Sequence, residues 1–170
     1  IPGVDLPHVV QAWDVLQDKV TTGKRVVIIG GGAVGVETAL FLAEKGTLSG
    51  EAIKFLLVNK AEDPETLYDL ATRGTKDIVV LEMIEKMGKD IGKTTRWGIL
   101  QDLSRKGITT KLTAKALEIT ETGVNVELDG NVETIPADTV VLAVGARSHN
   151  PLQKILDQKG IPCRVVGDAG

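Results

Sequence analysis

A run of three consecutive glycines between two patterned apolar segments constrains the fold more than any other feature of this sequence. Residues 24–29 are rich in Val and Ile and run directly into the glycines at 30–32. A short run of this kind is typical of a strand buried on both faces of a parallel sheet. Apolar residues then recur at helical spacing over 33–45, and Gly46 stands where such a helix would end. The order of strand, glycine turn and helix predicts the first unit of an open α/β sheet.

The segments that follow extend this unit. Further buried strands are expected at residues 77–82, 108–111 and 138–144, and a helix ended by Gly107 is expected at 94–106. A sheet of this kind binds ligands beyond the carboxyl ends of its strands.

Two regions interrupt the regular order of strands and helices. Three alternating segments separated by turn sequences predict an antiparallel meander, at residues 116–120, 124–128 and 132–135. Residues 47–76 predict a helical insertion, with short helices at 51–59 and 64–73. The expected fold class is α/β, a Rossmann-like open parallel sheet with an antiparallel β-meander and a helical insertion.

The two ends of the chain predict linking segments. Residues 1–22 open with a Pro- and Gly-containing stretch, and the apolar spacing of residues 9–19 predicts an amphipathic helix. Residues 151–170 are expected to contain a short apolar strand near Val165. Because the sequence starts without Met or a signal peptide, we expect a piece of a larger protein.

Composition narrows the class of protein further. The 170 residues are 42% hydrophobic, enough for one sizeable core, and the 20 Lys+Arg against 23 Asp+Glu form no long basic block. That balance argues against nucleic-acid binding, and no apolar run approaches the roughly 18 residues of a membrane span. The single Cys163, expected to be small and buried, fits a reducing, cytoplasmic compartment.

The glycine turn matches the pattern G-x-G-x-x-G in the context of a dinucleotide-binding turn, directly after a strand and before a helix. Gly30 would permit the tight turn, Gly32 would leave room for a diphosphate, and Gly35 would let the helix pack closely on the strand. Unpaired N–H groups and the positive end of the helix dipole would then face the phosphates. The candidate residues are Gly30, Gly31, Gly32, Ala33, Val34 and Gly35. No Lys-Ser or Lys-Thr follows, which excludes an NTP-binding P-loop, whereas a structural turn and a methyltransferase turn stay open.

An acidic residue at the end of the second strand provides a second test of nucleotide binding. Glu82 stands there, 47 residues beyond Gly35, and we attribute the long spacing to the insertion. Its carboxylate would accept hydrogen bonds from the ribose hydroxyls of NADH and would repel the 2′-phosphate of NADPH. Three basic residues follow that would either admit a phosphate or lie on the surface, namely Lys86, Lys89 and Arg96.

The run Gly30-Gly31-Gly32-Ala33-Val34-Gly35-Val36-Glu37-Thr38-Ala39 resembles the NAD(P)-binding domain of the pyridine nucleotide-disulfide oxidoreductases. In that family the acid two residues beyond the last glycine points toward the nicotinamide end. The resemblance therefore implies that Glu37 contacts the nicotinamide end. The other interpretation is a helix-surface glutamate stabilised by the helix dipole.

Residues 81–92, with Thr94-Thr95-Arg96-Trp97, are similar to the old-yellow-enzyme-like NADH:flavin oxidoreductases. That group contains 2,4-dienoyl-CoA reductase, enoate reductases and trimethylamine dehydrogenase. The resemblance implies a parent chain with an FMN-bearing TIM barrel, an iron–sulfur cluster and an FAD/NAD(P) module. Residues 1–22 would then lead in from the flavin domain, 23–150 would form the NAD(P)-binding domain, and 151–170 would return toward the FAD domain.

The same resemblance implies further cofactor contacts. The turn Val144-Gly145-Ala146-Arg147 would close over the cofactor, and Arg147 would neutralise a phosphate or pair with a surface acid. Asp168 would supplement FAD binding on the ribityl or phosphate side. The separate glycine fingerprint that holds FAD in the family is missing from this sequence, and so is a four-cysteine cluster motif. FAD, FMN and the iron–sulfur cluster are therefore expected elsewhere in the parent enzyme.

The glycine turn and Glu82 favour an NADH-binding module, and the resemblance implies that it presents the nicotinamide to a flavin held elsewhere in the chain. The implied partners are the FAD-binding domain and the FMN barrel of the same chain. A domain with a structural or partner-docking role and a methyltransferase remain the alternatives. We expect no catalytic residue here, since His8 and His149 are isolated from any Ser or Cys nucleophile. We also expect no metal site, since a single cysteine cannot form a four-ligand zinc site.

Overall fold

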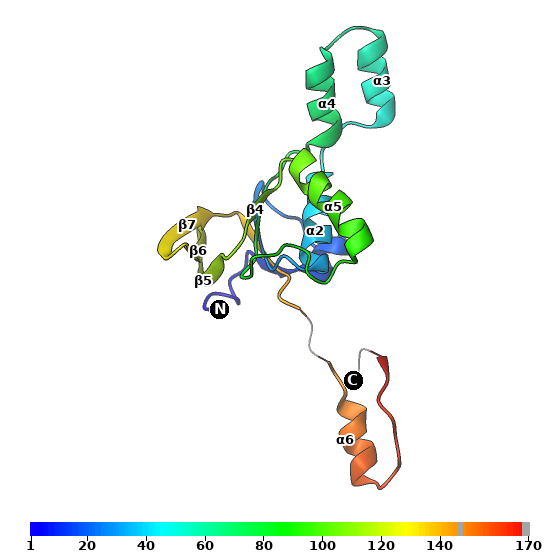
Figure 1. Cartoon of the computed structure of the whole chain (residues 1–170), viewed down its shortest axis with the longest axis vertical. Coiled ribbons are helices and arrows are strands. Elements are labelled where there is room, and N and C mark those ends of the chain that lie inside the picture. The colour runs from blue at the N-terminus through cyan, green and yellow to red at the C-terminus, as the bar shows by residue number, and fades with distance from the viewer. Residues whose placement is uncertain (146–147, 168–170) are drawn as a thin grey trace.

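The computed structural model describes residues 1–145 and 148–167, which contain two sheets flanked by helices (Figure 1). The parallel sheet has the spatial order β1 (Val9–Gln11), β8 (Thr139–Leu142), β2 (Arg25–Ile29), β3 (Asp77–Leu81) and β4 (Thr109–Lys111). The antiparallel sheet consists of β5 (Lys115–Thr120), β6 (Gly123–Leu128) and β7 (Asn131–Pro136). The expected α/β class, with its parallel sheet and its meander, is confirmed.

Strand β2 lies at the centre of the parallel sheet and is buried on both faces. Val26 and Ile28 face a cluster formed with α1 (Ala12–Leu16), α2 (Ala33–Ala43) and α5 (Lys93–Arg105). Val27 and Ile29 face the other way, toward apolar residues of the meander. Figure 1 shows the two layers, with the meander on one side of the sheet and α2 and α5 on the other. Burial on both faces explains why β2 reads as a continuous apolar run.

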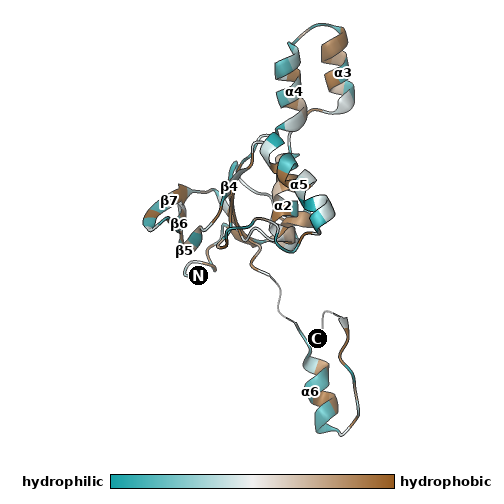
Figure 2. Ribbon diagram, in the orientation of Figure 1, coloured by the Kyte–Doolittle hydropathy of each residue, from teal (hydrophilic) through white to brown (hydrophobic). Residues whose placement is uncertain are grey.

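The insertion forms a helical hairpin of α3 (Gly50–Val58) and α4 (Pro64–Thr72), close to the predicted bounds. Asp63 caps α4 by accepting hydrogen bonds from the N–H groups of Glu65 and Thr66. The bonds with Thr66 lower the pKa of the Asp63 carboxyl. Figures 1 and 2 show the hairpin projecting beyond α5, with α3 largely hydrophobic.

The prediction of one helix over residues 9–19 is wrong. Val9–Gln11 is the edge strand β1, in parallel register with Val140, Val141 and Leu142 of β8, and only α1 is helical. Val9 packs toward the meander and Val10 toward the helices, which is the alternation of a strand. Pairing with a strand far away in the sequence therefore overrides the local helical spacing. Residues 9–11 belong to the same sheet as the strands of residues 23–150.

The C-terminal segment also differs from the prediction. Residues 151–158 form α6 (Pro151–Gln158), capped by the Asn150 side chain, which accepts a hydrogen bond from the N–H of Gln153. The expected strand near Val165 is absent from residues 161–166, and Cys163 is exposed instead of buried. The Asn-Pro pair was an overlooked helix-start signal, since Asn favours the cap and Pro the first turn. Among the helices of the described ranges, none is both long and apolar enough to cross a membrane.

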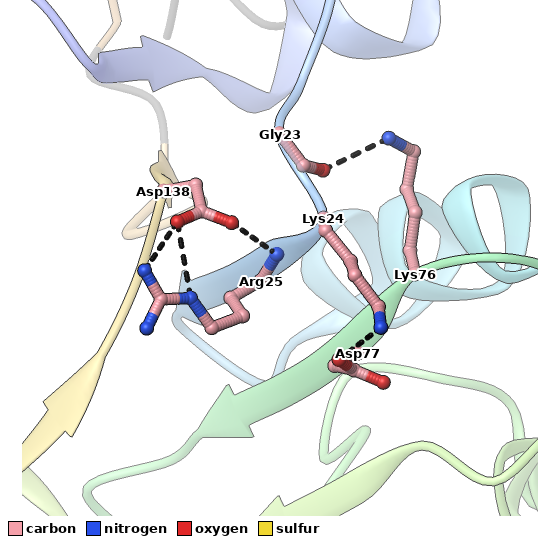
Figure 3. A network of polar contacts seen from close by, with 6 residues as sticks. All are labelled: Gly23, Lys24, Arg25, Lys76, Asp77 and Asp138. Carbon is pink, nitrogen blue, oxygen red and sulfur yellow. Dashed lines mark hydrogen bonds and ion pairs between the residues drawn. The ribbon is translucent and has the colours of Figure 1, made fainter.

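At the amino ends of the strands a network of polar contacts joins β2 to its two neighbours (Figure 3). Asp138 accepts hydrogen bonds from the Arg25 backbone N–H at 2.8 Å and from Arg25 Nε at 3.0 Å. Lys76 Nζ donates a hydrogen bond to the Gly23 carbonyl oxygen at 3.0 Å. Lys24 Nζ forms an ion pair with Asp77 Oδ2 at 3.7 Å. The hydrogen bond from Arg25 lowers the pKa of Asp138 from 3.8 to about 2.

Replacing Asp138 by Asn should remove a pH-dependent contribution to stability. The carboxyl has a lower pKa in the folded state, so its contribution is full above about pH 4 and is lost as the pH falls through about 2. Urea unfolding across this range should show wild type and Asp138→Asn differing most near neutral pH and converging in acid. The exposed Asp5→Asn variant is the control, and an equally large change in it would contradict the assignment.

Candidate functional site

A cavity of about 550 Å³ opens where the carboxyl ends of β2, β3 and β8 meet. The glycine turn forms its floor, Glu82 and Asp90 stand on one side, and Ala143, Val144 and Gly145 stand on the other. Much of the remaining lining is apolar, from Ile1, Ile29, Leu81, Met83, Ala114 and Ala116. An apolar cleft with a few converging polar groups, at this edge of an open α/β sheet, is where a ligand is expected.

Two of the four glycines in the turn, Gly30 and Gly35, are required by nearby backbone atoms, and Gly31 is packed against side chains. A Cβ on Gly30, whose φ is +110°, would lie 2.4 Å from the carbonyl oxygen of Ala143. A Cβ on Gly35 would lie 1.9 Å from the carbonyl oxygen of Gly30, and one on Gly31 would lie 2.3 Å from Met87 Sδ. The roles predicted for Gly30 and Gly35, a tight turn and a close approach of helix to strand, agree with this geometry.

Gly32 differs from the other three. Its φ of −71° suits any residue, and the nearest atoms that its Cβ would meet are the Asp90 carboxylate oxygens, at 3.2 and 3.3 Å. The fold therefore does not require glycine at position 32. Its Cβ would occupy space beside the amino end of α2, where the sequence predicts a diphosphate.

Two carboxylates bind the N–H groups of the turn. Glu82 Oε2 accepts from the N–H of Gly31 at 2.8 Å, and its Oε1 accepts from the N–H of Ile84 at 3.0 Å. Asp90 accepts from the N–H of Ala33, the first residue of α2, at 2.8 and 3.1 Å. The turn thus binds negatively charged oxygens, as the positive end of a helix favours.

The structure brings Glu82 to the glycine turn despite the long insertion between them. The loop of residues 83–92, which we call the 83–92 loop, also folds onto the turn. Its Gly88 N–H donates to the carbonyl of Gly31 at 2.6 Å, and Met87 is buried against Gly31. Arg96 Nε donates to the Met87 carbonyl at 2.7 Å, so Arg96 holds this loop.

The other predicted site residues divide into three groups. Val34, Val144 and Gly145 line the cavity, whereas Glu37 is exposed on α2 and is not among the lining residues. Lys86 and Lys89 are exposed. Ala146, Arg147 and Asp168 lie outside the described residues.

Sequence reasoning missed two charged residues at the cavity, Asp90 and Lys115. Asp90 lies in the 83–92 loop, which has no periodic pattern, and Lys115 begins β5 at the start of the meander. Asp90 is distant in sequence from the glycine turn, so only the way the 83–92 loop folds shows that its carboxylate lies at the expected anion site.

The chain belongs to the pyridine nucleotide-disulphide oxidoreductase family, whose sequence profile matches residues 1–168. A metal reductase of Desulforamulus reducens is 48% identical over 169 residues, which are 99% of this chain and 25% of that protein. An NADH oxidase of Thermoanaerobacter brockii is 35% identical, over 95% of this chain and 21% of that protein. The chain therefore spans between a fifth and a quarter of the length of these two relatives.

A solved structure supports the fold independently of close sequence similarity. The structure of 2-naphthoyl-CoA reductase in complex with 2-naphthoyl-CoA superposes with a TM-score of 0.70 at 24% identity, over 95% of this chain and 20% of that chain. At this identity the similarity concerns the fold alone.

Alanine at Gly35 should destabilise the fold, whereas valine at Gly32 should not. The Gly35→Ala methyl group would meet a backbone oxygen that cannot move freely, and overpacking of this kind costs about 1–3 kcal/mol or more. The Cβ that Gly32→Val introduces would have a side-chain carboxylate, that of Asp90, as its nearest neighbour. Urea unfolding of both variants checks this, and equal losses of stability would show that position 32 is also structural.

Proposed function

We propose that this chain is the NADH-binding domain of a larger flavin-dependent oxidoreductase. The observation that carries the proposal is Gly32, a glycine that the backbone does not need, beside the amino end of α2. A diphosphate there would accept hydrogen bonds from the N–H groups of the turn. Family membership and a relative named NADH oxidase support the same cofactor class.

Glu82 is proposed to bind the adenosine ribose. It stands directly after β3, next to the phosphate position, and its carboxylate lines the cavity. A carboxylate there would accept hydrogen bonds from both ribose hydroxyls and would repel a 2′-phosphate. NADH is therefore proposed as the preferred cofactor over NADPH.

The parent enzyme is proposed to belong to the old-yellow-enzyme-like NADH:flavin oxidoreductases. Such a parent would bind FAD, FMN and an iron–sulfur cluster in the parts of the chain outside these residues, with the FAD-binding domain and FMN barrel as partners. The bound NADH would supply a hydride to FAD. This chain would contribute orientation, by fixing the diphosphate at the glycine turn and the ribose at Glu82.

Calorimetric titration with NADH, NADPH and S-adenosylmethionine tests the proposal. Wild type should bind NADH, and Gly32→Val should abolish that binding because the side chain fills the phosphate position while the fold remains. Retained NADH affinity in Gly32→Val would remove the diphosphate assignment. Binding of S-adenosylmethionine alone would favour a methyltransferase instead.

The same titration tests whether Glu82 binds the adenosine ribose. Glu82→Ala should weaken NADH binding by about ten- to a hundredfold, as expected for lost hydrogen bonds to a charged group. NADPH should be affected less. Glu85→Ala, an exposed acid in the 83–92 loop, is the matched control. An unchanged preference between the two cofactors in Glu82→Ala would place the carboxylate outside the ribose site.

Removing the Asp90 carboxylate should strengthen NADH binding. Asp90 accepts the N–H of Ala33, one of the donors proposed for the diphosphate, so the cofactor must compete with it. Both Asp90→Asn and Asp90→Ala should therefore raise NADH affinity, by about three- to tenfold, given the modest net value of one such contact. Weaker binding in both variants would indicate that Asp90 supports the bound cofactor.

A further inference from the structure

A second cavity of about 290 Å³ lies at the carboxyl ends of β1 and β8, and Trp13 forms part of its wall. Val34, Ala143 and Gly145 line both this cavity and the larger one. The two hollows therefore meet at the end of β8 and at the start of α2. The smaller hollow extends the site toward β1.

Trp13 is presented to this hollow by the way α1 is anchored. Ala12 and Val15 are each only 1% exposed and pack into the core cluster with α2. Trp13 lies between them in the sequence and is 56% exposed. Burial of a large aromatic side chain ordinarily stabilises a fold. An indole that is exposed beside a cavity can instead stack against a flat ligand.

The order of the strands gives the direction of a bound dinucleotide. Glu82 follows β3, on one side of the glycine turn of β2, whereas β8 and β1 lie on the other side. A cofactor with its diphosphate at the turn and its adenosine ribose at Glu82 must extend its second nucleoside across β8. β1 is two strands from β2, about 10 Å at ordinary strand spacing.

We infer that Trp13 is a binding residue for the nicotinamide ring, which stacks on its indole in the smaller cavity. This inference rests on the proposed function, since it uses the orientation fixed by the glycine turn and Glu82. The indole positions the ring and takes no part in bond making. A tryptophan face also attracts a cationic ring, so it stabilises the positively charged pyridinium of NAD⁺.

Titration with NADH, NAD⁺ and ADP-ribose tests this assignment, because ADP-ribose has the diphosphate and both riboses but no nicotinamide. Trp13→Ala should lower the affinities for NADH and NAD⁺ by about five- to twentyfold. The affinity of the same variant for ADP-ribose should stay within about twofold of the wild-type value. Trp13→Phe should recover part of the loss. Trp97→Phe, on α5 and 70% exposed, is the matched control and should bind all three ligands as wild type does.

Fluorescence gives a second measurement, since the chain has only two tryptophans. In Trp97→Phe the emission of Trp13 should be quenched by NAD⁺ and NADH, and not by ADP-ribose. In Trp13→Phe the emission of Trp97 should not respond to NAD⁺.

The outcomes separate the two proposals. If wild type binds ADP-ribose and NADH and Trp13→Ala keeps both affinities, the Trp13 assignment is overturned while the proposed function stands. If Trp13→Ala lowers the affinities for ADP-ribose and for NADH equally, the Trp13 assignment is also overturned, because the indole would then contact the part that both ligands share. If wild type binds neither ligand, the proposed function fails and this inference fails with it.

Discussion

The close approach of α2 to the end of β2 is the constraint on which the site depends. With a hydrogen in place of Cβ at Gly35, α2 packs directly on the carbonyl of Gly30, and Gly30 in turn lies against the carbonyl of Ala143, the residue that follows β8. These contacts bring the amino end of a helix and the carboxyl ends of two strands to one place. The burial of β2 on both faces then fixes that place between the helix layer and the meander.

Two carboxylates lie at the amino end of α2, where the helix dipole favours negative charge. Glu82 directly precedes the 83–92 loop and Asp90 lies near the end of that loop, and each accepts a hydrogen bond from an N–H of the glycine turn or the start of α2. Their bonds hold the loop against the turn, together with the bond between Gly88 and Gly31. An anionic ligand at this turn would therefore compete with the protein's own acids for the same N–H groups, and its affinity would depend on the difference between the two sets of hydrogen bonds.

Local signals predicted much of this fold. β2, α2, the helical hairpin and the meander each have a periodic pattern bounded by turn residues, and the structure has them close to the expected bounds. Glu82 was predicted as a site residue because the end of a parallel strand fixes its position in the sheet.

The misses at β1 and at Asp90 have a common physical origin, a contact between residues far apart in the sequence. The residues of β1 pair with β8, about 130 positions later, and no local pattern reports such a contact. Asp90 reaches Ala33 only through the folding of an irregular loop. Cys163 follows Pro162 in a segment whose apolar residues suggested a strand, yet the described residues around it form none.

The position of β1 at the edge of the parallel sheet has a consequence for any shortened version of the chain. A polypeptide starting at residue 23 would lack β1 and would leave one side of β8 with unpaired backbone groups. Val140 and Val141 are fully buried there, so the bared edge would be both hydrophobic and rich in free donors and acceptors. An exposed edge of this kind favours the addition of strands from neighbouring molecules. By supplying β1, the first 22 residues therefore cover an edge that would otherwise favour aggregation.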